Sequence, residues 1–179
     1  EEKMGLNNTP LSERIHIGIF GRRNAGKSSV INAMTGQNLA IVSDVAGTTT
    51  DPVQKAMELL PLGPVVMIDT PGLDDVGELG KMRVEKAYQV LQKTDIAVIV
   101  IDASVGETAE DAAILAEIQK RSIPYIIVKN KADLTQKQDG ENEIFVSVKT
   151  GENISVLKER IAALAPKGEK EDRKSTRLN

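Results

Sequence analysis

The sequence predicts an α/β fold in which a mostly parallel sheet of six strands carries helices on both faces. Short apolar runs alternate along the chain with stretches of helical periodicity. Three of the apolar runs are continuous in Val and Ile, which is typical of parallel strands buried on both faces. Glycines and polar residues directly follow several of these runs, where the carboxyl ends of parallel strands meet.

Each strand is predicted from its apolar pattern. Residues 15–20, 64–68, 96–101 and 125–128 are short runs dominated by Ile and Val. Residues 52–60 alternate more weakly, with Val53, Met57 and Leu59 as the apolar positions. Residues 144–148 form the last strand.

Four helices are predicted between and after these strands. Residues 27–36 follow a glycine-rich turn, residues 81–93 and 107–121 have apolar positions at helical spacing, and residues 153–164 close the domain. Glu107, Glu110 and Asp111 favour a helix start because acidic groups are stabilised by the helix dipole there. Residues 37–51 and 70–80 lack a clear period and are predicted to be loops.

Composition narrows the class of protein. Of 179 residues, 40% are hydrophobic, which is enough for a sizeable core. The net charge is −3, so the chain lacks the excess of basic residues that is typical of nucleic-acid-binding proteins. The chain has no cysteine, so we expect no disulfide and no Fe–S cluster in it. No apolar run is long enough to span a membrane and no signal peptide is visible, so a cytoplasmic protein is expected.

The domain organisation is predicted from the same patterns. Residues 12–166 carry the alternating strands and helices and are expected to form one domain. Residues 1–11 are polar and are expected to be a flexible tail. Residues 167–179 are almost entirely charged and polar, and we expect a disordered tail or the start of a linker.

The segment Gly21–Ser28 has the sequence GRRNAGKS and fits the phosphate-loop pattern G-x-x-x-x-G-K-[ST]. It lies between a predicted strand and a predicted helix, so several backbone N–H groups and a helix N-terminus would face one point. A triphosphate suits that point, with Lys27 on the β- and γ-phosphates and the Ser28 hydroxyl on Mg²⁺. The predicted nucleotide contacts from this segment are Asn24, Ala25, Gly26, Lys27, Ser28 and Ser29.

Two further segments suit a metal and a γ-phosphate. Asp69–Gly72 fits D-x-x-G at a strand end, where the Asp69 carboxylate would hold the Mg²⁺ shell and the Gly72 N–H would sense the γ-phosphate. In the loop that contains Gly47, a hydroxyl such as that of Thr49 either completes the Mg²⁺ sphere or belongs to a plain polar loop.

The base is predicted from Asn130–Asp133, which reads N-K-x-D after a strand. The Asp133 carboxylate can accept hydrogen bonds from guanine N1–H and its 2-amino group, which adenine lacks. Asn130 would face the O6/N7 side and the stem of Lys131 would lie on the base plane. Backbone N–H groups of Ser147, Val148 and Lys149 are the predicted donors to guanine O6.

These motifs, in this order, resemble the Ras-like P-loop GTPase superfamily over about residues 15–164. The phosphate loop followed by Asp44–Thr49 is similar to the TrmE–Era branch of that superfamily. The segments Gly47–Val53, Lys55–Glu58 and Leu60–Pro64 resemble the GTPase domain of the HydF family of [FeFe]-hydrogenase maturation GTPases.

The resemblance implies a Mg²⁺-dependent GTPase that converts GTP to GDP and phosphate. It aligns the Mg²⁺-binding threonine of the family with Thr49. It also implies that Asn24 helps to bind a K⁺ ion beside the phosphates, although an Asn at this position is equally typical of a plain turn. Leu73 stands where other members have a water-orienting glutamine, and Leu cannot position water. The candidates for that task are Asp74, Asp75 and Glu78 in the predicted loop 70–80, and Glu78 is the first of them. The predicted catalytic residues are Lys27, Thr49, Gly72 and Glu78.

The same resemblance implies a role in assembling or delivering the hydrogenase active-site cluster, with the hydrogenase and other maturation proteins as partners and with possible pairing of two G domains. Two alternatives remain open. The module could serve tRNA or ribosome maturation, or it could be a GTP-binding scaffold with negligible hydrolysis. Arg22 and Arg23 either contact a phosphate or a partner, or are solvated surface charges.

Overall fold

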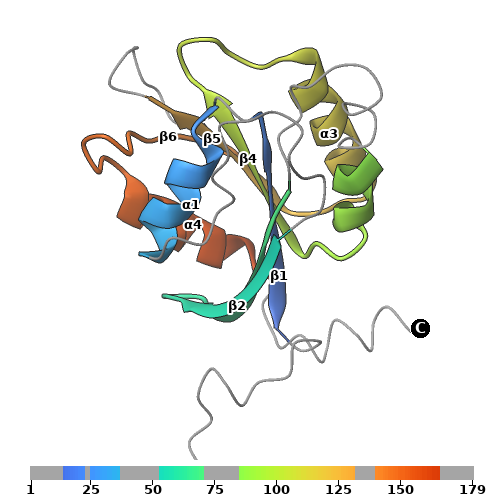
Figure 1. Cartoon of the computed structure of the whole chain (residues 1–179), viewed down its shortest axis with the longest axis horizontal. Coiled ribbons are helices and arrows are strands. Elements are labelled where there is room, and N and C mark those ends of the chain that lie inside the picture. Colours follow the sequence, from blue (N-terminus) through green and yellow to red (C-terminus); the bar gives the residue numbers. More distant parts are fainter. Residues whose placement is uncertain (1–13, 23–24, 37–52, 71–84, 132–139, 166–179) are drawn as a thin grey trace, which may run out of the picture.

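The computed structural model describes residues 14–22, 25–36, 53–70, 85–131 and 140–165 (Figure 1). The described strands form one six-stranded sheet in the order β2-β3-β1-β4-β5-β6. β2 pairs antiparallel with β3, and all other neighbouring pairs are parallel, which confirms the predicted mostly parallel sheet. The strands are β1 Ile15–Gly21, β2 Val53–Leu59, β3 Gly63–Asp69, β4 Ile96–Asp102, β5 Tyr125–Asn130 and β6 Glu143–Phe145.

Helices cover both faces of the sheet, as the sequence predicts. The named helices are α1 Lys27–Thr35, α3 Ala109–Lys120 and α4 Ile154–Leu164, and residues 85–91 are also helical. α1 and α4 lie on one side of the sheet and α3 lies on the other (Figure 1). Each side encloses its own apolar cluster, one with side chains from α1 and α4 and one with side chains from α3 and residues 85–91.

β4 lies in the middle of the core and explains why two layers of helices are needed. Its residues 96–101 are all buried. Because side chains alternate along a strand, Ile96, Val98 and Val100 enter the α1–α4 cluster, while Ala97, Ile99 and Ile101 enter the α3 cluster. A strand that is apolar on both faces can be stable only between two apolar layers.

Several element boundaries differ from the predicted ones by one or more residues. β5 continues to Asn130, because its ladder with β4 extends to the pair Asp102–Asn130. β6 ends at Phe145, two residues before Ser147, which forms an isolated bridge with Glu152 as the chain turns toward α4. The prediction that the last strand continues to residue 148 is therefore wrong.

The start of α3 is also corrected. It begins at Ala109, not at Glu107, because Thr108 is extended and caps the helix. The Thr108 side chain accepts from the Asp111 backbone, and the Asp111 side chain accepts from the Thr108 backbone, which forms a capping box. Among the residues that the structure describes, no helix is long and apolar enough to cross a membrane.

Gly18 in β1 offers a test of how tightly the core is packed. A Cβ at this position would lie 2.6 Å from Thr94 Oγ1, whose hydroxyl donates to the Val90 carbonyl. We expect Gly18→Ala to lower the free energy of unfolding by about 1–3 kcal/mol in a urea titration, because the core has no room for the methyl group.

Gly140→Ala is the matched control. Its added Cβ would meet nothing closer than 3.9 Å, so a change within about 0.5 kcal/mol is expected. Equal effects of the two substitutions would contradict this account of the packing.

Candidate nucleotide site

The candidate site lies at the carboxyl edge of the sheet, where four parallel strands end together. The register pairs Ile19 with Asp69, and it pairs Asp102 with Asn130. The segments that follow these strands are therefore neighbours, although they lie up to about a hundred residues apart in sequence. Loops at this edge are the usual location of ligand sites in open α/β sheets.

The end of the phosphate loop needs a glycine at position 26. Gly26 has φ of 88°, in the left-handed region, and an added Cβ would lie 2.2 Å from Asn130 Nδ2. The Ala25 N–H donates to the Arg22 carbonyl at 3.2 Å, which closes a turn across the loop. α1 then begins at Lys27 with no side-chain cap and no acidic residue in its first turn, so this N-terminus is suited to an anion.

Lys27 and Asp69, which the sequence assigns to phosphate and Mg²⁺, are ion-paired in the structure. Lys27 is only 5% exposed, and its ammonium group donates to the Asp69 carboxylate and to the Thr70 carbonyl. Buried charges are stable when they are paired and hydrogen-bonded in this way. The pair places both groups at the junction between α1 and the end of β3.

The oxygen atoms of the side chains at this position are also suitable ligands for Mg²⁺. This ion prefers hard oxygen ligands such as carboxylates and hydroxyls. Asp69, at the end of β3, supplies a carboxylate, and Ser28, in the first turn of α1, supplies a hydroxyl. Thr49, the third predicted ligand, lies outside the described residues.

Asn130 joins the phosphate loop to the segment after β6. Its Nδ2 donates to the Ala25 carbonyl at 3.2 Å, and its Oδ1 accepts from the Val148 N–H at 3.4 Å. The side chain is 4% exposed. The N-K-x-D pattern predicts contact between Asn130 and the base alone, because a local pattern does not show which two loops the side chain connects.

Lys131 is held in place by Asp102, a residue that the sequence analysis does not select. Lys131 has φ of 67°, and its ammonium group donates to Asp102 Oδ2 at 2.8 Å. Burial opposes the charge on Asp102, but hydrogen bonds from Lys131 and Ser104 together outweigh it and hold the pKa of Asp102 below its ordinary value. The feature of the sequence that could have identified Asp102 as a site residue is its position directly after the apolar run 96–101.

A cavity of about 500 Å³ opens beside these residues, which is a suitable size for a nucleoside. Three segments that are distant in sequence contribute to it, and every lining residue is among the predicted nucleotide contacts. They are Gly26, Ser29, Asn130, Lys131, Ser147, Val148 and Lys149. The structure therefore brings together the predicted phosphate and base segments around one hollow.

The segment after β6 uses part of its predicted hydrogen-bonding capacity internally. The Ser147 N–H donates to the Glu152 carbonyl at 3.2 Å, and the Val148 N–H donates to Asn130. The Ser147 hydroxyl accepts from the Thr150 N–H at 3.2 Å. These contacts shape the turn, so the prediction that Ser147 and Val148 direct their N–H groups at guanine O6 does not match the observed hydrogen bonds.

Several predicted site residues cannot be placed. Asn24, Thr49, Gly72, Glu78 and Asp133 lie outside the described residues. Leu73 also lies there.

Comparisons with known proteins agree with this geometry. A family model described as "50S ribosome-binding GTPase" matches residues 16–131. The tRNA modification GTPase MnmE of Laribacter hongkongensis is 35% identical over 169 residues, which cover 90% of this chain and 37% of that protein. The chain thus spans little more than a third of the length of this curated relative.

Solved structures give the same result. Aquifex aeolicus Era bound to GDP and AlF4⁻ superposes with a TM-score of 0.73 at 27% identity, over 88% of this chain and 58% of Era. The G domain of the T. maritima FeoB iron transporter superposes with a TM-score of 0.62 at 26% identity, over 86% of this chain and 99% of that domain.

The family match covers more than half of the chain, from His16 in β1 to Lys131. The matched region contains the phosphate loop, the Lys27–Asp69 pair and Asn130. The curated relatives of the chain are named GTPases. The chain belongs to the 50S ribosome-binding GTPase family and is a GTP-binding GTPase domain of the TrmE/Era type, with a Ras-like α/β fold.

Proposed function

We propose that this domain binds GTP with Mg²⁺ across the carboxyl edge of the sheet and hydrolyses it slowly unless K⁺ is present. The observation that supports this most strongly is the 500 Å³ cavity, whose lining is composed of the predicted phosphate and base segments. The cavity adjoins Gly26, which precedes Lys27, so base and phosphates can occupy one continuous site.

The base occupies the cavity between Asn130 and Lys149. Asp102 fixes the end of the Lys131 side chain, which leaves its aliphatic stem available to cover one face of the base. Asp133 reads the guanine N1–H and 2-amino group, as proposed from the motif. Because Ser147 and Val148 use their N–H groups internally, the Lys149 N–H is the proposed donor to guanine O6 from this segment.

The phosphates lie over the N-terminus of α1. Their arrival changes the partner of Lys27, whose ammonium group exchanges the Asp69 carboxylate for β- and γ-phosphate oxygens. The released Asp69 carboxylate, together with the Ser28 and Thr49 hydroxyls, would hold Mg²⁺, and the ion would supply positive charge that neutralises the phosphates. The Gly72 N–H completes the contacts to the γ-phosphate.

Hydrolysis needs an oriented water, and Leu73 cannot supply that contact. We assign this water-orienting role to Glu78. We further propose that a K⁺ ion held by Asn24 supplies the positive charge that an arginine finger supplies in other GTPases. Both assignments rest on the resemblance of the chain to the TrmE–Era branch. The negligible-hydrolysis scaffold is not favoured, because the chain belongs to a family whose named relatives are GTPases.

The central test is single-turnover GTP hydrolysis in Mg²⁺ with either KCl or NaCl. We expect hydrolysis to be about tenfold faster in K⁺, because a cation of the right size lowers the barrier by about 1.4 kcal/mol. Both salts are used at about 100 mM so that screening is equal. Asn24→Ala should remove the difference between the two salts while GDP still binds.

Two results would overturn parts of this proposal. Equal rates in the two salts would eliminate the role of K⁺ but leave GTP hydrolysis intact. Absence of GDP and GTP binding by the unaltered domain would eliminate the proposed nucleotide site itself.

The task of the whole protein has two candidates, each supported by a different observation. Relatives that are 35% identical are named tRNA modification GTPases, which favours a role in tRNA modification and is the better supported by the comparisons. The local resemblance of Gly47–Val53, Lys55–Glu58 and Leu60–Pro64 favours assembly or delivery of the [FeFe]-hydrogenase cluster, with the hydrogenase and its maturation proteins as partners. Both candidates place the domain in the cytoplasm and permit pairing of two G domains.

The full-length protein separates these candidates. A tRNA modification protein should bind tRNA in a filter assay and should gain no visible absorption on reconstitution with iron and sulfide. A cluster maturation protein should show the reverse, with cluster cysteines located outside this cysteine-free chain. GTP hydrolysis by this domain is expected in either case.

A further inference from the structure

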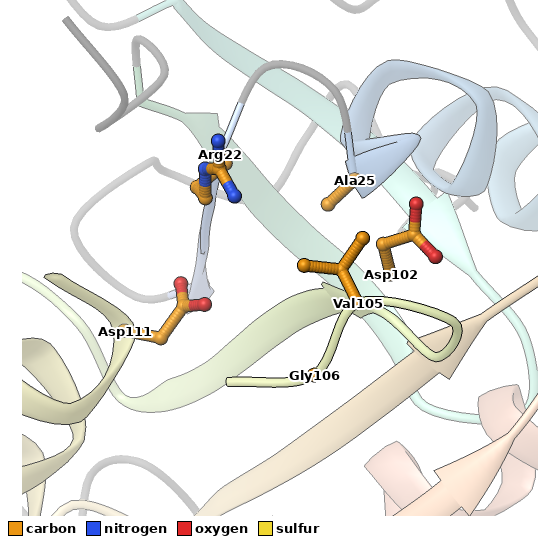
Figure 2. A pocket seen from close by; sticks show the side chains of 6 residues that line it. All are labelled: Arg22, Ala25, Asp102, Val105, Gly106 and Asp111. Atoms are coloured by element: carbon orange, nitrogen blue, oxygen red, sulfur yellow. The ribbon is translucent and has the colours of Figure 1, made fainter. Parts of the chain in front are cut away.

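A second, smaller cavity lies against the other flank of the phosphate loop. Its volume is about 150 Å³, and Figure 2 shows its lining. The walls come from Arg22 and Ala25 of the phosphate loop, from Asp102 at the end of β4, from Val105 and Gly106 after β4, and from Asp111 in α3. Apart from the phosphate loop itself, none of these segments lines the proposed nucleotide cavity.

Asp111 presents one carboxylate oxygen to this region without a hydrogen-bond partner. Its Oδ2 accepts from the Thr108 N–H at 3.1 Å and from the Thr108 hydroxyl at 3.0 Å, so this single oxygen completes the capping box. Asp111 is only 2% exposed, and among the described residues its Oδ1 is the buried side-chain oxygen or nitrogen that lacks any partner. The helix cap therefore does not account for the second oxygen.

A buried carboxylate with an unpaired oxygen lowers stability unless a countercharge compensates for it. Burial raises the pKa of Asp111, while Thr108 and the positive charge of Arg22 oppose that rise. Among the described residues, the other two charged groups near Asp111 are anions and give no such compensation. Asp102 is an anion already paired with Lys131, and Glu110 is an anion on the same helix.

Arg22 places a positive charge near this carboxylate from a different element, although burial still keeps the pKa of Asp111 above its ordinary value. Figure 2 shows the Asp111 carboxylate pointing from α3 toward the side of the cavity on which the Arg22 guanidinium lies. Arg22 follows Gly21, the last residue of β1, and its carbonyl accepts the Ala25 N–H that closes the phosphate-loop turn. The orientation of Arg22 thus affects the backbone that leads to Gly26 and Lys27.

Gly21 makes this anchoring necessary. Its φ of 150° lies in a region that side chains rarely adopt, and an added Cβ would lie 2.6 Å from the Val100 carbonyl oxygen. The chain therefore leaves β1 through a residue with no side chain to hold its direction. The next side chain is that of Arg22, and Asp111 is the acidic group of this cavity whose charge favours one position for it.

We propose that Asp111 is a positioning residue for the phosphate loop, which it orients by attracting the Arg22 guanidinium across the small cavity. The inference rests on the proposed nucleotide site and gives Arg22 a role other than phosphate contact or plain surface charge. Asp111 touches no nucleotide in this account. Its effect reaches the phosphates through Arg22, the Arg22–Ala25 turn and the start of α1.

The test compares nucleotide affinity with stability in Asp111→Asn. The amide keeps the shape of the side chain and an oxygen for Thr108, but removes the charge that attracts Arg22. We expect GDP affinity, measured by calorimetry, to fall about fivefold to tenfold. We expect the melting temperature of the nucleotide-free domain to stay equal or rise, because a buried charge has been removed.

Arg22→Gln should give a similar loss of affinity, and the double variant should lose little more than either single variant, since both remove the same interaction. Glu110→Gln is the matched control, because it removes a neighbouring exposed charge from the same turn of α3. Its GDP affinity should stay within about twofold of the unaltered domain.

Three outcomes would overturn the inference. They are unchanged GDP affinity in Asp111→Asn, a loss of affinity that parallels a loss of melting temperature, and fully additive effects of the Arg22 and Asp111 substitutions. Failure of the unaltered domain to bind GDP in the same assay would instead overturn the proposed nucleotide site, so the two failures are distinguishable.

Discussion

The hydrogen bonds of the Asn130 side chain are the contacts on which the rest of the site depends. One end of the amide holds the carbonyl of Ala25 in the phosphate loop, and the other holds the N–H of Val148 after β6. Asn130 can reach both loops because it is the last residue of β5 and is buried at the shared carboxyl edge of the sheet. A single buried side chain thus fixes the distance between the phosphate and base halves of the cavity.

The same edge of the sheet holds two ion pairs, Lys27–Asp69 and Lys131–Asp102. Ion pairs of this kind contribute little net stability, because desolvation of the charges offsets their attraction. Their effect is better described as positional. Each pair keeps a long, flexible lysine at the rim of the site, so less side-chain freedom remains to be lost when a nucleotide binds.

The two pairs differ in what binding must do to them. Lys131 can keep Asp102 as its partner while its stem covers the base. Lys27 must release Asp69 before it can contact phosphate, and the released carboxylate is then available to Mg²⁺. In the proposed site, nucleotide and metal binding would thereby be coupled at the Asp69 carboxylate.

The sequence predicted the sheet, its two helical layers and the grouping of the motifs, because buried parallel strands have a distinctive apolar pattern and their carboxyl ends meet. It did not predict the partners of individual side chains. Asp102 and Asp111 were not selected as site residues, since an Asp at a strand end or a helix start is common and its partners depend on three-dimensional contacts. The end of β6 was also misplaced, because the apolar run continues to Val148 although the ladder with β5 includes only Glu143–Phe145.

The most direct test of this account measures the affinity of Asn130→Ala for GDP and for magnesium pyrophosphate by calorimetry. If Asn130 supports the phosphate loop, both affinities should fall, by about fivefold to 150-fold for the loss of buried hydrogen bonds worth about 1–3 kcal/mol. If Asn130 serves only the base, the loss should be confined to GDP, and unchanged pyrophosphate affinity would contradict the central role given to this side chain.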